Sequence, residues 1–389
     1  MKKLRNHQLR VLSQMHKYQK GQVIVPTGGG KTMCMITDAK CELKGKNQTI
    51  VVVSPRILLT QQLSKDFLEQ ITSPVRVLHV HSGDTSHYST TDKKEIFNWG
   101  VNNWNHNKII FTTYHSLHKI QEAGIPVNTI YFDEAHNSVQ RHFHPATRFY
   151  ASLGNVRCYF FTATPKHSSS DEIIGMNNEY VYGKVLEQVP APELVDNDII
   201  LPPKVVVKEL DMIKDRKPTP EDDADNILAT LDEQNVNKIL ICARRTTQIT
   251  NLISDSKLTT ELYSRGYNWM YITSRTGAVI NGIKVSRNQF FDTLRTWGVE
   301  DHRKFIVMHH SILSEGISVP GLEAALFLRN MDFITISQTI GRVIRKGNEQ
   351  KQFGIVCVPV YDKVGITTSR KVEAVVDTIF NKGQPAITH

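Results

Sequence analysis

The chain has 389 residues, of which 40% are hydrophobic and 22% are charged, and its formal net charge is +9 with an isoelectric point near 9.2. This length exceeds what one ordinary hydrophobic core needs and suits two domains. No apolar run approaches the roughly 20 residues that a membrane helix needs, so we expect no membrane-spanning helix. The basic start MKKLRNHQLR is followed by no apolar segment, so we expect no signal peptide.

The excess of lysine and arginine favours a polyanionic partner, because these residues release counterions from phosphates when they bind; simple solubility is the plainer interpretation. The five cysteines include no Cys-x-x-Cys pair. This pattern predicts a reducing cytoplasm, the host's if the protein is viral, and no structural zinc site. The pairs His79-x-His81 and His142-x-His144 lack a complete ligand set, so we interpret them as ordinary histidines.

Short β-branched runs alternate with longer amphipathic stretches, a pattern typical of a parallel sheet wrapped by helices. Most of the runs lack period-two alternation, as expected for strands buried on both faces. The runs of the first half are Gln22–Val25, Thr49–Val53, Arg76–Val80, Lys108–Thr112, Thr129–Phe132 and Arg157–Thr162. Those of the second half are Lys204–Leu210, Lys238–Cys242, Trp269–Thr273, Lys304–Met308, Ala324–Leu328 and Phe353–Pro359.

A segment rich in proline, from Val189 to Pro203, separates the two series and is typical of a linker. The acidic segment Pro218–Asp225 is expected to cap a helix, with its acids at the positive end of the helix dipole. We therefore predict an α/β protein of two tandem domains, residues 1–188 and 204–389, joined by a linker over 189–203. Each domain is expected to be a mostly parallel sheet flanked by helices.

Residues 26–32 read PTGGGKT, directly after an apolar run. A strand, a glycine-rich turn and Lys-Thr at the start of a helix form a phosphate cradle, because glycines let backbone N–H groups converge on an anion and the helix dipole acts at the same point. Lys31 would reach the β- and γ-phosphates, and the Thr32 hydroxyl would ligate Mg²⁺. The strict pattern has glycine where this chain has Val25, so a glycine-rich turn without a ligand is the alternative.

Two acids follow the strand predicted at Thr129–Phe132, in the tetrapeptide Asp133-Glu134-Ala135-His136. Open α/β sheets bind ligands at the carboxyl ends of their strands. Asp133 would hold Mg²⁺, commonly through water, and Glu134 would orient or deprotonate the attacking water. The tetrapeptide alone is a weak signal, but about a hundred residues after PTGGGKT it indicates a metal-assisted ATP site.

The segment from Thr335 to Lys346 has helical character, and Gln338, Arg342 and Arg345 fall on one face of that helix. Two arginines aimed together are costly unless an anion lies opposite them, and arginine fingers that stabilise a phosphoryl transition state fit this geometry. A solvated basic face is the alternative. We expect the second domain to complete an ATP site formed on the first, so that ATP binds in the cleft between them and its hydrolysis opens and closes the cleft.

These stretches and several others resemble, in order, the motifs of superfamily 2 helicases with a DEAH-type motif II. The matching stretches are PTGGGKT for motif I, VVVSPRILLTQQ (51–62) for Ia, FTTYHSL (111–117) for Ib, FDEAH (132–136) for II, FTATP (161–165) for III, LICARRT (240–246) for IV, SEGISVPGL (314–322) for V and QTIGRVIR (338–345) for VI. Leu4-Arg5-x-x-Gln8 resembles the family's adenine-reading segment. The resemblance covers nearly the whole chain and implies two RecA-like domains with ATP and Mg²⁺ as cofactors.

The resemblance also implies roles for individual residues. Those expected to bind ATP are Arg5, Gln8, Thr27, Gly28, Gly29, Gly30, Lys31, Thr32 and Gly316, with Thr32 and Asp133 on the metal. The catalytic set is Lys31, Asp133, Glu134, Gln338, Arg342 and Arg345. The nucleic-acid contacts are Pro55, Arg56, Thr112, Thr113, Arg244 and Ser311, for each of which a helix cap or loop role is the alternative. His136, Thr162 and Thr164 would couple hydrolysis to strand movement, and a structural histidine is the alternative for His136.

Two departures from the family pattern are Ser318, where many relatives have aspartate, and Thr339, where the usual motif VI has arginine. QTIGRVIRKG and SEGISVPGL are closer to restriction-enzyme motor subunits and phage branch-migrating helicases than to the RNA-remodelling DEAD-box group. The chain also ends soon after motif VI, without the C-terminal modules of the spliceosomal DEAH enzymes. We therefore favour DNA over RNA, and the short length hints at a viral or mobile-element origin.

The leading hypothesis is an ATP-dependent DNA helicase or translocase, including one that remodels branched DNA in recombination or replication. An RNA helicase is one alternative, and an ATP-gated motor subunit that clamps duplex for a nuclease partner without unwinding it is another. A replication, recombination or nuclease protein is the expected partner of a monomeric chain that binds no membrane. Asn281-Gly282 predicts a β-hairpin, which would act as a strand-separating pin or form an inert surface insertion.

Overall fold

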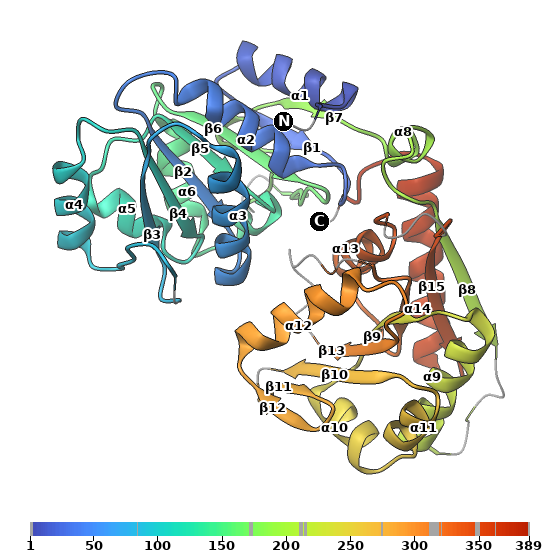
Figure 1. Cartoon of the computed structure of the whole chain (residues 1–389). Helices are drawn as coiled ribbons and strands as arrows, with labels where there is room; N and C mark the ends of the chain where they lie inside the picture. Colours follow the sequence, from blue (N-terminus) through green and yellow to red (C-terminus); the bar gives the residue numbers. More distant parts are fainter. Residues whose placement is uncertain are drawn as a thin grey trace. The chain divides into compact units, whose positions relative to one another are not determined.

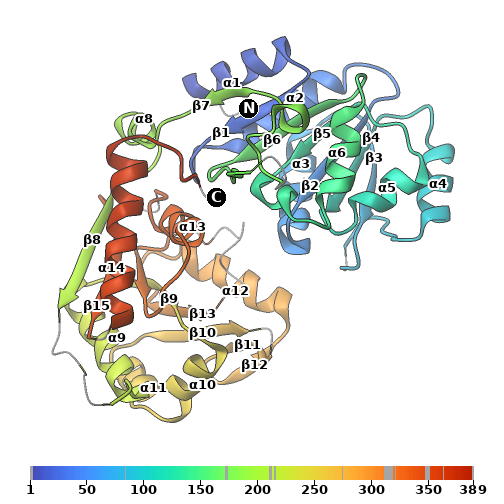
Figure 2. The same cartoon turned by 180° about the vertical axis from the view of Figure 1, so that it is seen from behind.

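The computed structural model describes residues 3–83, 85–170, 174–209, 213, 216–273, 275–310, 319, 321–346, 351–361 and 363–387. The chain forms two compact units, shown in Figure 1 and from behind in Figure 2. Unit 1 comprises Met1–Pro190 and Pro385–His389, and unit 2 comprises Ala191–Gln384.

Unit 1 is built on a seven-stranded sheet in the order β3-β4-β2-β5-β6-β1-β7, and each of its strand pairs is parallel. Its central strands are buried along their whole length, which explains why their sequences are apolar without alternation. The strands are β1 (Lys20–Ile24), β2 (Thr49–Ser54), β3 (Arg76–Val80), β4 (Lys108–Thr113), β5 (Thr129–Phe132), β6 (Arg157–Thr162) and β7 (Val185–Gln188).

Helices cover both faces of this sheet. Along β5, Ile130 and Phe132 enter one apolar core, whereas the Tyr131 side chain points to the other face and bonds Asp38 of α2. The helices of unit 1 are α1 (Asn6–Lys17), α2 (Lys31–Glu42), α3 (Ile57–Gln70), α4 (Lys93–Asn102), α5 (Leu117–Ala123), the 3₁₀ helix η1 (Ala135–Val139), α6 (His144–Ser152) and α7 (Glu179–Tyr182). Because the strands are parallel, their carboxyl ends and the loops that follow meet at one edge.

Unit 2 has an eight-stranded sheet in the order β12-β11-β10-β13-β9-β14-β15-β8. It is parallel from β10 to β8, and β11 and β12 add an antiparallel edge. The strands are β8 (Pro203–Glu209), β9 (Lys238–Cys242), β10 (Asn268–Thr273), β11 (Gly277–Ile280), β12 (Ile283–Val285), β13 (Phe305–His309), β14 (Ala324–Phe327) and β15 (Gly354–Val360). The predicted hairpin is present, with Asn281 and Gly282 both at positive φ in the turn between β11 and β12.

The helices of unit 2 are α8 (Ala191–Asp196), α9 (Pro220–Gln234), α10 (Thr246–Ser254), α11 (Leu258–Ser264), α12 (Arg287–Val299), α13 (Phe333–Val343), α14 (Lys363–Val376) and the π helix η2 (Asp377–Asn381). The acidic segment begins a helix as predicted, because Thr219 caps α9 and the Asp222 carboxylate accepts from the Thr219 backbone N–H at 2.7 Å. The predicted α/β class, with two mostly parallel sheets flanked by helices, is confirmed.

The segment 189–203, predicted to be a linker, has structure of its own. It contains α8 and belongs mainly to unit 2. Leu194 and Ile200 are buried, and the Leu201 backbone N–H donates to the carbonyl of Ile344 at 2.7 Å. The prolines are compatible with this packing because proline is accepted in the first turn of a helix and before a strand.

Candidate active site

The PTGGGKT segment forms a tight loop between β1 and α2 in unit 1. Gly28 and Gly30 both have φ near +88°, a left-handed conformation that favours glycine. A Cβ on Gly30 would lie 2.5 Å from Nε2 of Gln8, so a larger residue would displace the Gln8 side chain of α1. The loop leads into α2, which begins at Lys31. The first N–H groups of a helix have no partner within the helix and are suited to bind an anion at this end.

Helix α1 holds this loop through two adjacent side chains. His7 is buried, and its Nε2 donates to the carbonyl oxygen of Gly29 at 2.7 Å. Gln8 donates from Nε2 to the Gly30 carbonyl at 3.2 Å, and its Oε1 accepts from the backbone N–H of Arg5 at 3.0 Å. The Arg5 side chain is exposed. The sequence pattern predicted a role for Arg5 and Gln8 but not for His7. The only sign in the sequence that His7 could take part was its position next to Gln8.

Lys31 lies at the base of the loop with a nearly buried side chain. Its Nζ donates to the carbonyl of Val25 at 3.3 Å and lies 3.9 Å from Oε1 of Glu134. Thr32, the next residue of α2, is half-buried. The structure therefore brings the lysine of the loop beside one of the two acids that follow β5.

Asp133 and Glu134 follow β5, which lies between β2 and β6 in the sheet. Burial, followed by the neighbouring Glu134, raises the pKa of Asp133 to about 7. Glu134 adopts a left-handed conformation with φ of 47°, which is costly for a non-glycine residue and common at functional sites. The backbone N–H and Nδ2 of Asn137 both donate to the Glu134 carbonyl at 3.0 Å and hold this conformation.

The donor set at this point fits a divalent cation and a polyphosphate. Oε2 of Glu134 is buried and accepts no hydrogen bond from the residues that the structure describes, and Asp133 is buried beside it. Two adjacent buried carboxyl groups beside one lysine need more positive charge than that lysine provides. A bound Mg²⁺ ion would supply the missing positive charge. Asp133 and Thr32 are the residues that would hold Mg²⁺, and the loop from Thr27 to Lys31 would hold the phosphates.

The raised pKa of Asp133 predicts a pH dependence of the stability of unit 1. Between about pH 4 and pH 7 the folded chain keeps the Asp133 proton that the unfolded chain has released, so the free energy of unfolding falls as pH rises through this range. The effect is about 1.4 kcal/mol for each unit of pKa difference. Asp133→Asn stays neutral and is expected to be more stable than the wild type at pH 8 but not at pH 4. Urea unfolding at the two pH values measures this difference; equal effects at both would contradict it.

His136, Thr162 and Thr164 form one buried cluster behind the two acids. Nδ1 of His136 lies 3.0 Å from Oγ1 of Thr162 and 3.3 Å from Oγ1 of Thr164. Nε2 of His136 accepts from Nδ2 of Asn137 at 3.2 Å, which places the ring proton on Nδ1, facing the threonines. Nδ1 also lies 3.6 Å from Oε2 of Glu134. The three residues predicted to couple hydrolysis to movement thus lie together next to Glu134, and their coupling role stays a prediction.

The nucleic-acid contacts expected in unit 1 lie just after β2 and in the last two residues of β4, at the same edge of the sheet. Arg56 is exposed and precedes the first residue of α3, a helix start that carries no side-chain cap. Pro55 is buried beside it. Thr112 is fully buried and donates to the Val80 carbonyl at 3.0 Å, and Thr113 is also buried. Arg56 is therefore the most accessible of these four for a ligand, whereas Thr112 already serves the fold.

In unit 2, Gln338 and Arg342 lie on α13, where both side chains are buried. The helix was predicted to reach Lys346 but ends at Val343, so Arg345 lies beyond it and forms a backbone bridge to Ile200. Arg345 is half-buried. Just beyond the helix, the Ile344 carbonyl accepts from the Leu201 backbone N–H at 2.7 Å.

The remaining expected contacts of unit 2 are Arg244, Ser311 and Gly316. Arg244 follows β9, and its Nε donates to the Leu328 carbonyl at 2.7 Å. Ser311 and Gly316 lie outside the described residues.

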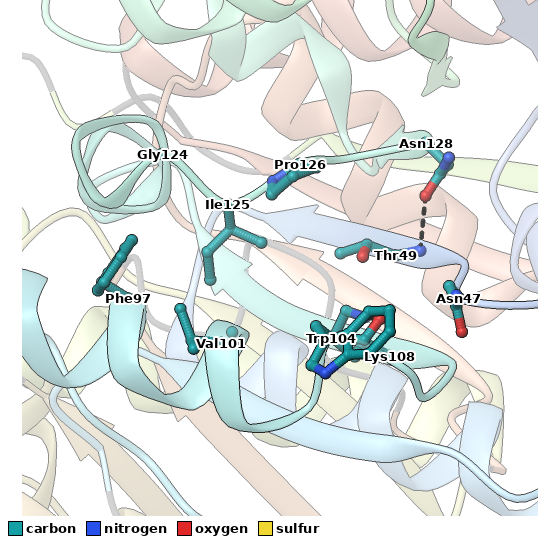
Figure 3. Close-up of a pocket in the computed structure, with 11 residues that line it drawn as sticks. Asn47, Thr49, Phe97, Val101, Trp104, Lys108, Gly124, Ile125, Pro126 and Asn128 are labelled. Carbon is teal, nitrogen blue, oxygen red and sulfur yellow. Dashed lines mark hydrogen bonds between the residues drawn. The ribbon is translucent and has the colours of Figure 1, made fainter.

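A separate cavity of about 280 Å³ lies at the opposite edge of the unit 1 sheet, between α4 and the starts of β2, β4 and β5 (Figure 3). Phe97, Val101 and Trp104 give it an apolar wall, and the Asn128 side chain accepts from the Thr49 backbone N–H at 2.8 Å beside it. Because it lies at the amino ends of the strands, it is not part of the site around Lys31.

Within the described part of the chain, no helix has both the length and the apolar character needed to cross a bilayer. Over the same residues, no cluster of three or more histidine, cysteine or acidic side chains is arranged to hold a metal ion.

Comparison with known proteins gives the class of fold. Residues 1–167, less than half of the chain, match the family model described as "Type III restriction enzyme, res subunit". No curated protein matches the sequence significantly.

Three solved structures share the fold of both units. The ATP-dependent Type ISP restriction-modification enzyme LlaBIII bound to DNA has a TM-score of 0.71 at 17% identity, over 100% of this chain and 31% of that one. A nuclease-deletion mutant of the Type ISP enzyme LlaGI, in complex with a DNA substrate mimic, has a TM-score of 0.60 at 19% identity. The match covers 97% of this chain and 29% of that one. S. cerevisiae Dbp5 bound to RNA and ADP BeF3 has a TM-score of 0.61 at 16% identity. The match covers 98% of this chain and 88% of that one.

The chain thus spans about a third of the length of the two restriction enzymes. The predicted resemblance to superfamily 2 helicases, with restriction-enzyme motors among the similar proteins, is confirmed.

Proposed function

We propose that the chain is an ATP-dependent DNA helicase or translocase, which couples ATP hydrolysis to movement on DNA or to its remodelling. The observation that carries this proposal is the grouping of the glycine loop, Lys31, Asp133 and Glu134 at one edge of a parallel sheet. A glycine loop alone binds an anion, whereas the two acids beside Lys31 add the means to hold a metal and activate water.

ATP hydrolysis needs three contributions, and residues of this chain are available for each. The loop N–H groups and Lys31 would bind the phosphates, and Gln8 with Arg5 would read the adenine. Bound Mg²⁺ would neutralise charge on the phosphates. Glu134 would orient the attacking water and take its proton.

Gln338, Arg342 and Arg345 of unit 2 are proposed to act on the same nucleotide. Guanidinium groups stabilise the negative charge that develops on a transferring phosphoryl group. Their contribution would make hydrolysis depend on the approach of unit 2 to the nucleotide, and the His136, Thr162 and Thr164 cluster next to Glu134 would transmit that change within unit 1. Movement along a polymer follows when both units grip it and their separation changes with each hydrolysis cycle.

Both units offer backbone-binding positions at the carboxyl edges of their sheets. α3 begins after Arg56 and α10 begins after Arg245, and neither of these N-cap arginine side chains caps its helix. An uncapped helix N-terminus with an arginine beside it is suited to a phosphate, and phosphate contacts position a nucleic acid without reading its sequence. Arg244, Thr113 and Ser311 remain proposed contacts of the same kind.

The test is the rate of ATP hydrolysis with no polymer, single-stranded DNA, duplex DNA, a four-way DNA junction or RNA, at one fixed salt concentration. We expect DNA to stimulate hydrolysis, most strongly as a junction, and Lys31→Ala to remove the activity with each polymer. Stimulation by RNA alone would replace DNA by RNA as the substrate. Stimulation without displacement of an annealed strand would indicate a translocase or a duplex clamp. Equal rates with and without every polymer would contradict a nucleic-acid motor.

The second candidate is an RNA helicase, because the chain shares its fold with Dbp5 over nearly the whole length of both proteins. The two restriction enzymes, one bound to DNA and one in complex with a DNA substrate mimic, share the same fold, and this favours DNA as the first candidate. A role as the motor of a larger nuclease assembly, or in recombination or replication, is a further part of the proposal that only partner experiments can test.

A further inference from the structure

Unit 2 contains a broad pocket of about 920 Å³ that the sequence pattern did not identify. It is lined by segments that follow three parallel strands, β8, β9 and β15. Figures 1 and 2 show β8 beside β15 at this side of the unit 2 sheet. The pocket therefore lies at the carboxyl edge of the sheet, the edge at which open α/β sheets bind ligands.

The part of the pocket lining that the structure describes is rich in basic side chains. Five basic residues contribute to it: Arg216, Lys217, Arg244, Arg245 and Lys363. Among the described lining residues the one acid is Asp223, whose carboxylate accepts from Nε2 of Gln248 at 2.5 Å and from the hydroxyl of Tyr361. Clustered like charges on a concave surface focus the electrostatic field and attract a polyanion.

Not all of this positive charge is available to a ligand. Arg216 is paired with Asp222, and its guanidinium holds the pKa of that carboxyl well below the usual range. Lys217, Arg245 and Lys363 are exposed, and within the described residues none of the three has a carboxylate at ion-pair distance. These three cations and Arg244 give the described part of the lining its excess of positive charge.

The start of α10 adds hydrogen-bond donors to the same pocket. This helix begins at Thr246 without a side-chain cap, and the exposed Thr247 lines the pocket. The start of α9, in contrast, is closed by the bonds between Thr219 and Asp222. Uncapped N–H groups, a hydroxyl and arginine side chains are the groups that bind phosphate oxygens.

We propose that this pocket binds backbone phosphates of the nucleic acid, with Arg245 and Lys363 as contact residues. The proposal rests on the proposed function and extends it beyond the Arg244 position to the segments after β8 and β15. A polymer suits the pocket better than a small phosphate ester, because the cations are exposed and spread over three loops instead of enclosing one anion. Such contacts would be independent of sequence.

The test compares two full-length double variants with the wild type. Arg245→Ala with Lys363→Ala removes two charges from the pocket. Arg295→Ala with Lys382→Ala removes two exposed charges elsewhere in unit 2, each of which is paired with an acid. Fluorescence anisotropy measures the affinity of each protein for a labelled single-stranded oligonucleotide at several salt concentrations.

We expect the pocket variant to bind the oligonucleotide roughly tenfold more weakly at low salt, and its log–log salt slope to be shallower by about 0.7 for each phosphate that the variant no longer neutralises. The control variant should match the wild type, and circular dichroism melting should be alike for all three. Equal slopes and affinities for the pocket and control variants would overturn the inference.

Two further measurements separate the possible outcomes. Titration of Lys31→Ala with inorganic tripolyphosphate tests a small-anion site; saturable binding that the pocket substitutions abolish, with oligonucleotide affinity unchanged, would overturn a polymer site. Polymer-stimulated ATP hydrolysis by the wild type tests the proposed function separately. If polymer still stimulates hydrolysis and all variants bind the oligonucleotide with equal affinity, only the proposed phosphate-binding pocket is contradicted. If the wild type binds no oligonucleotide, both the pocket and the proposed function are contradicted.

Discussion

Replacing Glu134 by glutamine is expected to leave ATP bound and to reduce its hydrolysis by a factor of about 10² to 10⁴, the usual contribution of general acid–base catalysis. Glutamine has nearly the shape of glutamate but cannot accept a proton from water. Lys31 would keep its bond to the Val25 carbonyl, and the glycine loop would keep its own geometry, because neither depends on the Glu134 side chain. Binding and turnover should therefore separate in this variant.

The measurement pairs the affinity for a fluorescent ATP analogue with the steady-state hydrolysis rate. Glu69→Gln makes the same chemical change on α3, where Glu69 is exposed and lies 3.9 Å from Lys65, and should behave as the wild type. Hydrolysis that survives in Glu134→Gln would show that another group activates the water. Loss of ATP binding would instead assign Glu134 a role in holding Lys31, from which it lies 3.9 Å.

Replacing Asp38 by alanine is expected to destabilise unit 1 by about 3–5 kcal/mol, the cost of removing one partner from a buried ion pair. Asp38 is fully buried on α2. It accepts from the Tyr131 hydroxyl of β5 at 2.6 Å and from the Arg157 guanidinium of β6 at 3.1 and 3.3 Å. Alanine would leave the buried Tyr131 hydroxyl without its acceptor and would remove one of the two α2 carboxylates that pair with Arg157, the other being Glu42 at 2.5 Å.

Unfolding in urea measures this destabilisation, and hydrogen exchange of the β5 and β6 amides assigns it to unit 1. Arg10→Ala is the control, because its ion pair with Glu187 is exposed on the Arg10 side and should contribute less than about 1 kcal/mol. A change in Asp38→Ala no larger than that of Arg10→Ala would contradict the role of this network. Since Lys31 begins α2, a real destabilisation should also weaken ATP binding.

The strands and the phosphate loop followed from local chemistry. The predicted runs at Arg76–Val80, Thr129–Phe132 and Arg157–Thr162 match β3, β5 and β6 at both ends, because buried parallel strands must be apolar along their length. β7 was missed, since it is short and only its Leu186 is buried. The proline segment hid α8, because proline in a first helical turn looks like a linker in the sequence.

The sequence by itself determined the glycine loop, the paired acids and their order along the chain, because backbone freedom and charge at those positions are properties of the residues alone. Only the tertiary structure decided that His7 holds the loop, that Asn137 fixes the strained Glu134, that Asp38 joins α2 to the sheet, and that basic residues from three loops line one pocket. Most of these contacts join residues far apart in sequence, and all are made by common residue types, so their meaning depends on which neighbours the fold places beside them.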